Sequence, residues 1–290
     1  MNYEDFICSL RTRMKEELGR SAQVTITSVM KNNGVRKDGL TIQQEGAQIA
    51  PTVYVDEFYR EYCRGTTMPE ILEQLLKVYR KNVPKEIFDA SFFRDFESVR
   101  GLLTCRLINR EKNAELLRTV PYQKFLDLAL VVFCNVEHDA IGKGAILIHE
   151  SHLRMWDITK NELFVIAREN TRVTSPEELI SMGELLREMT GEELITEESP
   201  MYVLSNQQRM YGAVHIIFDQ VLQKIAEELK GDFWVLPSSI HECIVLPEDF
   251  RMTREELERM VHEVNTYEVE EEDILSDRVY YYNRRLHRLS

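Results

Sequence analysis

The chain of 290 residues contains 43% hydrophobic and 29% charged residues and has a formal net charge of −13. This balance is typical of a folded globular protein and excludes an intrinsically disordered chain. Its length suits two or three packed units. No apolar run reaches the roughly 18 residues of a membrane helix, and the acidic N-terminus lacks the basic start of a signal peptide. We therefore expect a cytoplasmic protein without a membrane partner.

Residues 3–18 place apolar side chains at helical spacing, and a glycine follows them. Alternating and β-branched residues with Asn-Gly and Asp-Gly turns then predict a small antiparallel sheet within residues 23–55. Two helices follow, the second opened by a capping box of Thr67 and Glu70. These elements predict an N-terminal α+β unit at residues 1–84.

The remaining residues, 85–290, predict a larger C-terminal α+β unit. Its strand-like segments are 101–108, 124–136, 145–150, 201–205, 211–218, 233–236 and 241–246. Its helix-like segments are 85–95, 112–117, the residues after a capping box of Thr159 and Glu162, 177–189, 220–229 and 253–265. We expect 201–205 and 211–218 to pair across a polar turn.

Strands and helices are segregated in short hairpin-plus-helix groups, which argues against a doubly wound fold. We predict an α+β protein with antiparallel sheets, helices packed on one face, and two units. Within the second unit, residues 176–200 are expected to form an acidic helix and a linker.

The negative charge is concentrated in two segments. Residues 176–200 have a net charge of −7 and residues 248–277 a net charge of −9, whereas residues 278–290 hold four arginines and no acid. A phosphate-binding face needs clustered Lys and Arg. The body of the chain is therefore not expected to bind nucleic acid, and the acidic segments are interpreted as solvated helix faces.

The five cysteines are odd in number and form no Cys-x-x-Cys pair, which predicts reduced thiols and excludes a zinc ribbon. Cys105 and Cys134 lie within apolar, strand-like runs. We expect buried free thiols of the kind that a reducing cytosol maintains.

Four segments, VMKNNGVRKDGLTI, APTVYVDEFY, YVLSNQQRMYGA and LPSSIHECIVLP, together resemble a domain-of-unknown-function family of low-GC Gram-positive bacteria. The likeness runs from about Val24 to Val279, and its most distinctive parts are NNG…GLTI and LPSSIHE. The resemblance implies an intracellular bacterial protein, either host-encoded or carried by a mobile element. It implies no activity.

The segment SSIHEC offers Ser239, His241 and Glu242 as candidate catalytic residues of a hydrolase. In a strand, Ser239 and His241 share one side with Cα atoms about 6–7 Å apart, which is loose for a nucleophile and its base. No glycine elbow accompanies the serine. The structural alternative places residues 243–246 in a central strand and uses His241 and Glu242 to hold neighbouring loops.

The segment HESH offers His149 and His152 as candidate metal ligands, with His215 or His241 as a distant third. Histidines three apart meet one metal only when both are helical, and His149 is expected to end a strand, with Ser151 capping the next helix. The spacing also lacks the HExxH pattern of a metalloprotease. We therefore expect no metal and no cofactor.

The stretch GKGA at residues 142–145 lacks the Walker pattern and precedes a strand, so it is interpreted as a turn. The tail RVYYYNRRLHRLS mixes arginines with aromatic residues, which suits either single-stranded nucleic acid or a last edge strand with a basic end.

We expect a non-catalytic protein-binding or regulatory module whose partner is another protein. The first alternative is a hydrolase with its site around His241 and Glu242, with or without a metal. The second is a nucleic-acid-associated protein that uses the arginine-rich tail.

Overall fold

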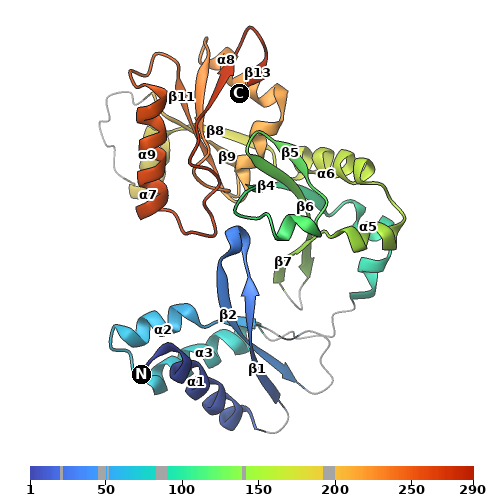
Figure 1. Cartoon of the computed structure of the whole chain (residues 1–290), viewed down its shortest axis with the longest axis vertical. Coiled ribbons are helices and arrows are strands. Elements are labelled where there is room, and N and C mark those ends of the chain that lie inside the picture. Colours follow the sequence, from blue (N-terminus) through green and yellow to red (C-terminus); the bar gives the residue numbers. More distant parts are fainter. Residues whose placement is uncertain (20–21, 45–49, 51, 83–89, 139–141, 192–199) are drawn as a thin grey trace. The chain divides into compact units, whose positions relative to one another are not determined.

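The chain divides into two compact units (Figure 1). Unit 1 comprises Met1–Asp95 and Asn135–Ala145, and unit 2 comprises Phe96–Cys134 and Ile146–Ser290. Unit 1 thus extends past residue 84, where we place the boundary from the sequence, and takes in a second segment. The computed structural model describes residues 1–19, 22–44, 50, 52–82, 90–138, 142–191 and 200–290.

Unit 1 combines helices with a small antiparallel sheet of order β1-β2-β3. Its described elements are α1 (Tyr3–Leu18), β1 (Ala22–Met30), η1 (Asn32–Gly34), β2 (Arg36–Gln44), β3 (Thr52–Tyr54), α2 (Asp56–Cys63), α3 (Met68–Asn82) and η2 (Ala90–Arg94). The predicted capping box of α3 is confirmed, because the Thr67 backbone N–H donates to Glu70 Oε2 at 2.8 Å. Gly19 ends α1 at a φ of 71°, which glycine adopts without strain.

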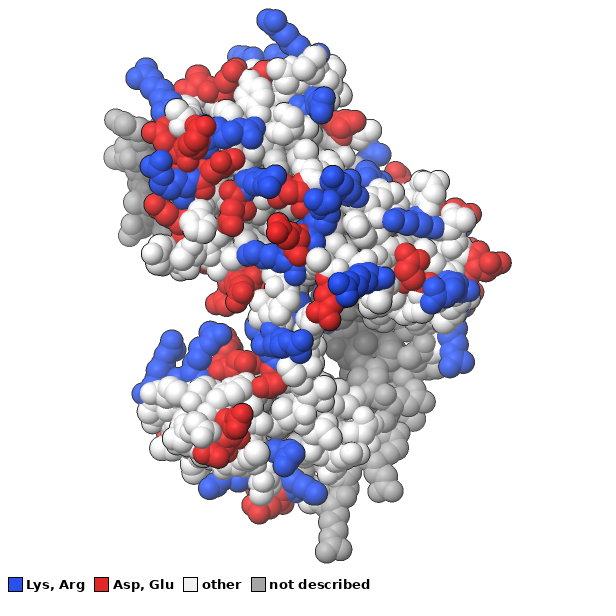
Figure 2. All heavy atoms as spheres, viewed as in Figure 1, with Lys and Arg blue, Asp and Glu red and all other residues white. Residues whose placement is uncertain are grey.

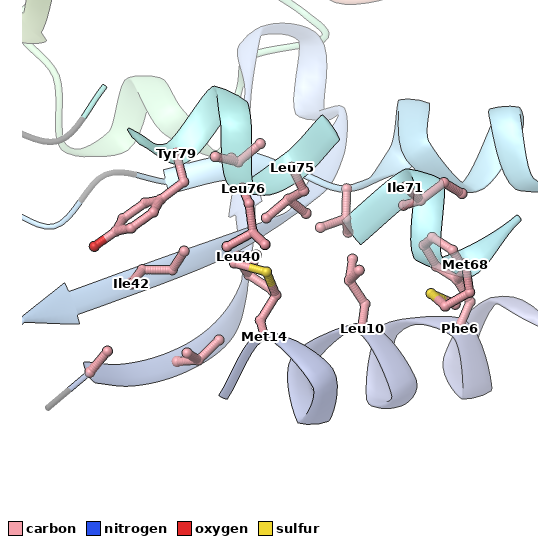
Figure 3. Packing of buried hydrophobic residues seen from close by; sticks show 14 residues of the cluster. Phe6, Leu10, Met14, Leu40, Ile42, Met68, Ile71, Leu75, Leu76 and Tyr79 are labelled. Carbon is pink, nitrogen blue, oxygen red and sulfur yellow. The ribbon is translucent and has the colours of Figure 1, made fainter. Parts of the chain in front are cut away.

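One apolar core holds unit 1 together (Figure 3). Phe6, Leu10 and Met14 follow the i, i+4, i+8 spacing of α1 and are fully buried. Their side chains face Leu40 of β2 and Leu75 of α3. Burial of each such side chain contributes about 1.5–3 kcal/mol, so the amphipathic face of α1 accounts for its docking on the sheet.

Unit 2 contains the remaining elements, although the outer parts of β6 and β7 fall in the second segment of unit 1. These elements are α4 (Phe96–Arg100), β4 (Leu103–Asn109), η3 (Leu116–Arg118), β5 (Gln123–Phe125), β6 (Leu128–His138), β7 (Gly142–Leu147), α5 (Glu150–Trp156), α6 (Lys160–Thr174), β8 (Glu177–Ser181), α7 (Met182–Thr190), β9 (Tyr202–Asn206), η4 (Gly212–Ile217), α8 (Asp219–Glu228), β10 (Phe233–Leu236), β11 (Cys243–Pro247), α9 (Arg254–Tyr267), β12 (Tyr280–Asn283) and β13 (Arg288–Leu289).

The first sheet of unit 2 has the order β4-β6-β5, with β7 also paired to β6. Helix α6 covers the open edge of β4: the Cys105 backbone N–H donates to Thr171 Oγ1 at 2.8 Å, and Asn170 Nδ2 donates to the Leu103 C=O at 3.0 Å. Side chains of α6 thus take the place of a neighbouring strand, which protects this edge from pairing with another chain. The predicted capping box of Thr159 and Glu162 opens α6 and is confirmed.

The second sheet has the order β13-β12-β10-β11-β9-β8, and the pairings given for its strands are antiparallel. Strand β11 lies between β10 and β9, which confirms that residues 243–246 occupy a central strand. Cys243, Val245 and Leu246 are fully buried, so both faces of β11 are covered. Helix α9 packs on one face, where Leu257 and Val261 contact the core around Leu246. The antiparallel sheets of both units confirm the predicted α+β class.

Several local predictions are wrong. The predicted strand at 211–218 is instead the 3-10 helix η4 (Gly212–Ile217) with its two flanking residues, because β8 and β11 already occupy both edges of β9. Residues 177–181 form β8, so the acidic helix begins only at Met182. The predicted strand 124–136 is two strands, since Leu126 adopts a φ of 52° at the turn between β5 and β6. The stretch GKGA begins β7 and is no turn.

Other predicted segments fall on residues without a described structure. Most of the predicted helix at 85–95 and of the linker within 176–200 lies outside the described residues. Among the helices that the structure describes, none has the length and hydropathy that crossing a membrane requires.

All five cysteines are free thiols. Cys105, Cys134 and Cys243 are buried in strands, as predicted for the first two. Cys8 and Cys63 are exposed, because both lie on the solvent side of the amphipathic helices α1 and α2. Three of the five thiols are thus buried, which agrees with the prediction that the cysteines are mostly buried.

Candidate functional site

His241 is the centre of a cluster in which two distant segments of the chain meet. Its backbone C=O accepts hydrogen bonds from the Gly212 N–H and from the Ser205 hydroxyl, both at 2.8 Å. Its Nδ1 accepts a hydrogen bond from the Tyr211 backbone N–H at 3.2 Å. We call Ser205, Tyr211, Gly212, His241 and Asp273 the His241 cluster. It joins YVLSNQQRMYGA to LPSSIHECIVLP.

The fifth member of the His241 cluster, Asp273, comes from a third segment. Its Oδ1 lies 3.4 Å from His241 Nε2. Backbone hydrogen bonds at 2.8 Å hold this segment in place, from the Ile240 N–H to the Asp273 C=O and from the Leu275 N–H to the Ser238 C=O. Because Nδ1 accepts, a neutral His241 carries its proton on Nε2, facing the carboxylate. Both ring nitrogens therefore have a partner.

Residues 207–211 form a loop that is held in place by side-chain contacts with Asn206 at the end of β9 and with α7. Asn206 accepts from the Met210 N–H at 3.2 Å and donates to the Met210 C=O at 2.8 Å. Arg209 Nη2 lies 3.2 Å from Glu188 Oε2 of α7. Arg209 and Tyr211 have φ values of 53° and 58°. The left-handed conformation costs a non-glycine residue about 1–2 kcal/mol, so the surrounding contacts hold the loop in a strained shape.

Gly212 follows this loop and touches the backbone of β9. A Cβ at Gly212 would stand 2.6 Å from Ser205 Cα, 2.8 Å from Asn206 N and closer still to Ser205 Oγ. Real Cβ atoms do not approach backbone so closely, so only glycine fits between β9 and the His241 cluster.

The other two candidates in SSIHEC have no catalytic arrangement around them. Ser239 Oγ accepts a hydrogen bond from the His241 backbone N–H at 3.0 Å and so caps its own turn. Glu242 is half-buried and lies directly before Cys243 at the start of β11. Among the described hydrogen bonds, none joins Ser239 Oγ or Glu242 to the His241 ring. The geometry offers no nucleophile, base and orienting acid in series.

Arg106 of β4 lies in a sandwich of aromatic rings beside the His241 cluster. Its guanidinium carbon is 3.6 Å from the ring centroid of Tyr211 and 4.1 Å from that of Phe133. Arg106 is buried, and burial lowers the pKa of its guanidinium. Stacking on two ring faces offsets part of that desolvation cost. The Tyr211 ring thus contacts Arg106 and also lies 5.2 Å from the His241 ring, measured between ring centroids.

His149 and His152 form the N-terminal cap of α5. His149 is the N-cap residue, and its backbone N–H donates to His152 Nδ1 at 3.1 Å. The Thr119 hydroxyl lies 3.3 Å from His149 Nδ1. Ser151 is therefore not the cap, because the helix begins two residues earlier than predicted. Burial, followed by the neighbouring His149, lowers the pKa of His152.

His215 of η4 is 1% exposed; its ring nitrogens make no described hydrogen bond, although the Ser175 backbone lies near enough to the ring to raise its pKa. Burial lowers the pKa of His215 to about 4, against the opposing effect of Glu177. The ring is neutral at pH 7 and packs at 5.9 Å from Phe218. Across the described residues, His, Cys, Asp and Glu form no group of three that could hold a metal ion.

A comparison with protein-family models tests the resemblance to a family of unknown function that the four sequence segments indicate. A model described as a family of unknown function, DUF5688, matches residues 3–284. The chain belongs to the DUF5688 family. Neither a curated protein nor a solved structure matches the chain. Membership of DUF5688 brings no assigned activity, so the function of this DUF5688 chain is argued from its geometry.

Sequence reasoning missed several members of the site in this DUF5688 chain. Asp273 lies in an acidic stretch of the sequence, where no pattern distinguishes it from its neighbours. Arg106 lies inside an apolar strand, and a lone charge within such a run is a signal that could have been read as a buried, partnered side chain. Gly212 follows a polar turn and shows its packing role only in three dimensions.

Proposed function

We propose that this protein is a non-catalytic protein-binding module of the bacterial cytoplasm, with the 207–211 loop as its contact surface. The observation that carries the proposal is the bonding of His241. Nδ1 accepts from Tyr211 and Nε2 faces Asp273, so no ring nitrogen is left to act as a base. These hydrogen bonds are those of a structural residue that holds the 207–211 loop in place.

The loop has two properties that favour recognition. It is held in one shape by Asn206, Arg209 and His241, so a partner pays little ordering entropy on binding. Its exposed residues are Gln207, Gln208 and Met210, the last with 52% exposure. Methionine adapts its shape to apolar pockets and is common at protein-binding surfaces.

A partner suited to this loop offers a small apolar pocket for Met210 and hydrogen-bonding groups for the two glutamine amides. Glutamine amides each donate and accept, which fits the backbone of another protein. The hydrolase alternative is less well supported, because Ser239 bonds backbone and Glu242 is not joined to His241.

Photo-crosslinking from position 208 in the native cell tests the proposal. A benzoylphenylalanine in place of Gln208 should capture a protein, which is then identified and purified for binding measurements. Met210→Glu should weaken that binding at least about ten-fold, the effect of removing one apolar anchor. Met155→Glu is the matched control, since Met155 is 44% exposed on α5, outside the loop.

Equal weakening by Met210→Glu and Met155→Glu would contradict the loop as contact surface. The same preparations should be assayed on ester and phosphoester substrates. Turnover by the parent protein that disappears in His241→Gln would replace the binding proposal with the hydrolase.

A further inference from the structure

Unit 2 also contains a pocket of about 340 Å³, and no residue of the His241 cluster lines it. Four cationic side chains line it, and they come from four different parts of the chain. They are Arg110 after β4, Lys124 of β5, Arg254 at the start of α9 and Arg278 before β12. Two carboxylates, Glu111 and Asp127, also line the pocket. We call it the cation pocket.

None of the four cationic residues of the cation pocket forms an ion pair with a described carboxylate, although such pairs form elsewhere in unit 2, for example between Lys224 and Glu177. The guanidinium of Arg254 lies 5.5 Å from the ring centroid of Trp234. This contact orients Arg254 without cancelling its charge.

The carboxylate of Asp127 is already engaged by neutral donors. Its Oδ1 accepts from the Tyr280 hydroxyl at 2.6 Å and its Oδ2 from the Ser276 hydroxyl at 2.8 Å. These bonds tie the turn between β5 and β6 to the strand region of β12, and so build the wall of the pocket. Asp127 keeps its negative charge in these bonds, so the excess of positive charge follows from the lining, in which four cationic residues stand against the acidic residues Glu111 and Asp127.

We propose that the cation pocket binds a small ligand that carries two or more phosphate groups. Guanidinium groups donate in a planar fork that matches phosphate oxygens, and three of the four cations are arginines. A volume of about 340 Å³ is at the lower end of small-molecule sites. Several cationic residues in the lining of one small pocket favour a ligand with several negative charges.

The surroundings of the pocket favour a short anion over a nucleic acid. Arg254 begins α9, and residues 248–277 around it have a net charge of −9. A long polyanion that followed the surface away from the pocket would meet this acidic helix. Figure 2 shows acidic and basic side chains mixed over the visible face of unit 2, without a continuous basic stripe. A nucleic-acid path requires such a stripe.

The test titrates the full-length protein with sodium tripolyphosphate by calorimetry, with tryptophan fluorescence as a second readout because Trp234 contacts Arg254. We expect saturable binding at one site. Replacement of two pocket arginines, Arg254→Gln with Arg278→Gln, should weaken binding at least about ten-fold, the loss of two charge-assisted contacts. The matched control is Arg285→Gln with Arg288→Gln, which removes the same charge outside the pocket lining.

Lys124→Gln is an independent single variant of an exposed side chain and should weaken tripolyphosphate about three-fold or more. Sulfate at equal ionic strength should not displace the ligand. Absence of saturable binding, or equal weakening by the pocket and control pairs, would overturn the proposal. Tighter binding of oligothymidylate through the same arginines would also overturn it, in favour of a nucleic-acid function.

Discussion

The His241 imidazole accepts a hydrogen bond from the backbone N–H of Tyr211, a residue held at a φ of 58°. The bond runs from a strained loop to a turn that is otherwise 30 residues away in sequence. It links the two motifs that stand out in the chain, and it gives His241 a structural task. The hydrogen bond to His241 and the strained backbone conformation are thus found at the same residue, Tyr211.

Gly212→Ala should destabilise unit 2 by at least about 2 kcal/mol, because the new Cβ overlaps the backbone of Ser205 and Asn206. Urea unfolding followed by tryptophan fluorescence measures this directly, since Trp156 and Trp234 are the only two tryptophans and both belong to unit 2. Gly101→Ala is the control: nothing lies within 4 Å of its added Cβ, and it should change stability by less than about 0.5 kcal/mol. Similar effects of the two substitutions would contradict the close approach at Gly212.

Local features of this fold could be predicted from the sequence, because their signals lie within a few residues. The capping boxes at Thr67 and Thr159 and the apolar run of β11 are of this kind. The conformation of residues 211–218 could not be predicted in this way. Their alternating apolar side chains fit a strand, and a strand is excluded only because β8 and β11 already pair with β9. Tertiary context overrides local preference there.

The candidate site was only partly predictable for the same physical reason. His241 stands out as a histidine between serines and a carboxylate, and its position at the edge of β11 follows from the apolar run beside it. Its partners Tyr211 and Asp273 are each about 30 residues away in the chain, and contacts of such separation leave no periodic signal. The cation pocket collects residues from five separate segments, and no pattern in one sequence indicates that they meet.

Thr171→Val should cost about 1–3 kcal/mol, because it leaves the buried Cys105 N–H on the edge of β4 without an acceptor. Thr171→Ser keeps the hydroxyl and should cost less than half as much. Urea unfolding of the two variants provides the comparison. If serine and valine were equally destabilising, the methyl group and not the hydrogen bond would explain the role of Thr171.

His215 makes the stability of unit 2 dependent on pH. Its pKa is lowered to about 4 by burial, so the folded state binds this proton less readily than the unfolded chain. The stability contributed by the neutral ring is complete above about pH 6.5 and is lost as the pH falls toward 4. Between pH 7.5 and pH 5 the loss should be about 2 kcal/mol.

His215→Leu removes the titrating group and breaks no described hydrogen bond. At pH 7.5 the variant should be about as stable as the parent, and its stability should fall less between pH 7.5 and pH 5. Urea unfolding at the two pH values gives both numbers. An identical fall in parent and variant would show that other groups cause the acid sensitivity.

Thiol labelling of the native protein should modify Cys8 and Cys63 and spare the three buried cysteines. Burial raises the pKa of the Cys105 thiol to about 12 and that of Cys134 to about 11, so neither forms the reactive thiolate at pH 8. Mass spectrometry after a maleimide pulse counts the modified sites. Labelling of all five at equal rates would contradict the buried strands β4, β6 and β11.

The unfolding free energies of Ser239→Ala, His241→Ala and Glu242→Ala test most directly whether the His241 cluster is structural. His241→Ala should lose about 1–3 kcal/mol, because the Tyr211 N–H and Asp273 lose their partner, and Ser239→Ala about 1 kcal/mol for its single turn bond. Catalytic groups are often held at a cost to stability, so their removal tends to stabilise a protein. If His241→Ala and Glu242→Ala both proved more stable than the parent, the structural account of His241 would be contradicted and the hydrolase would take its place.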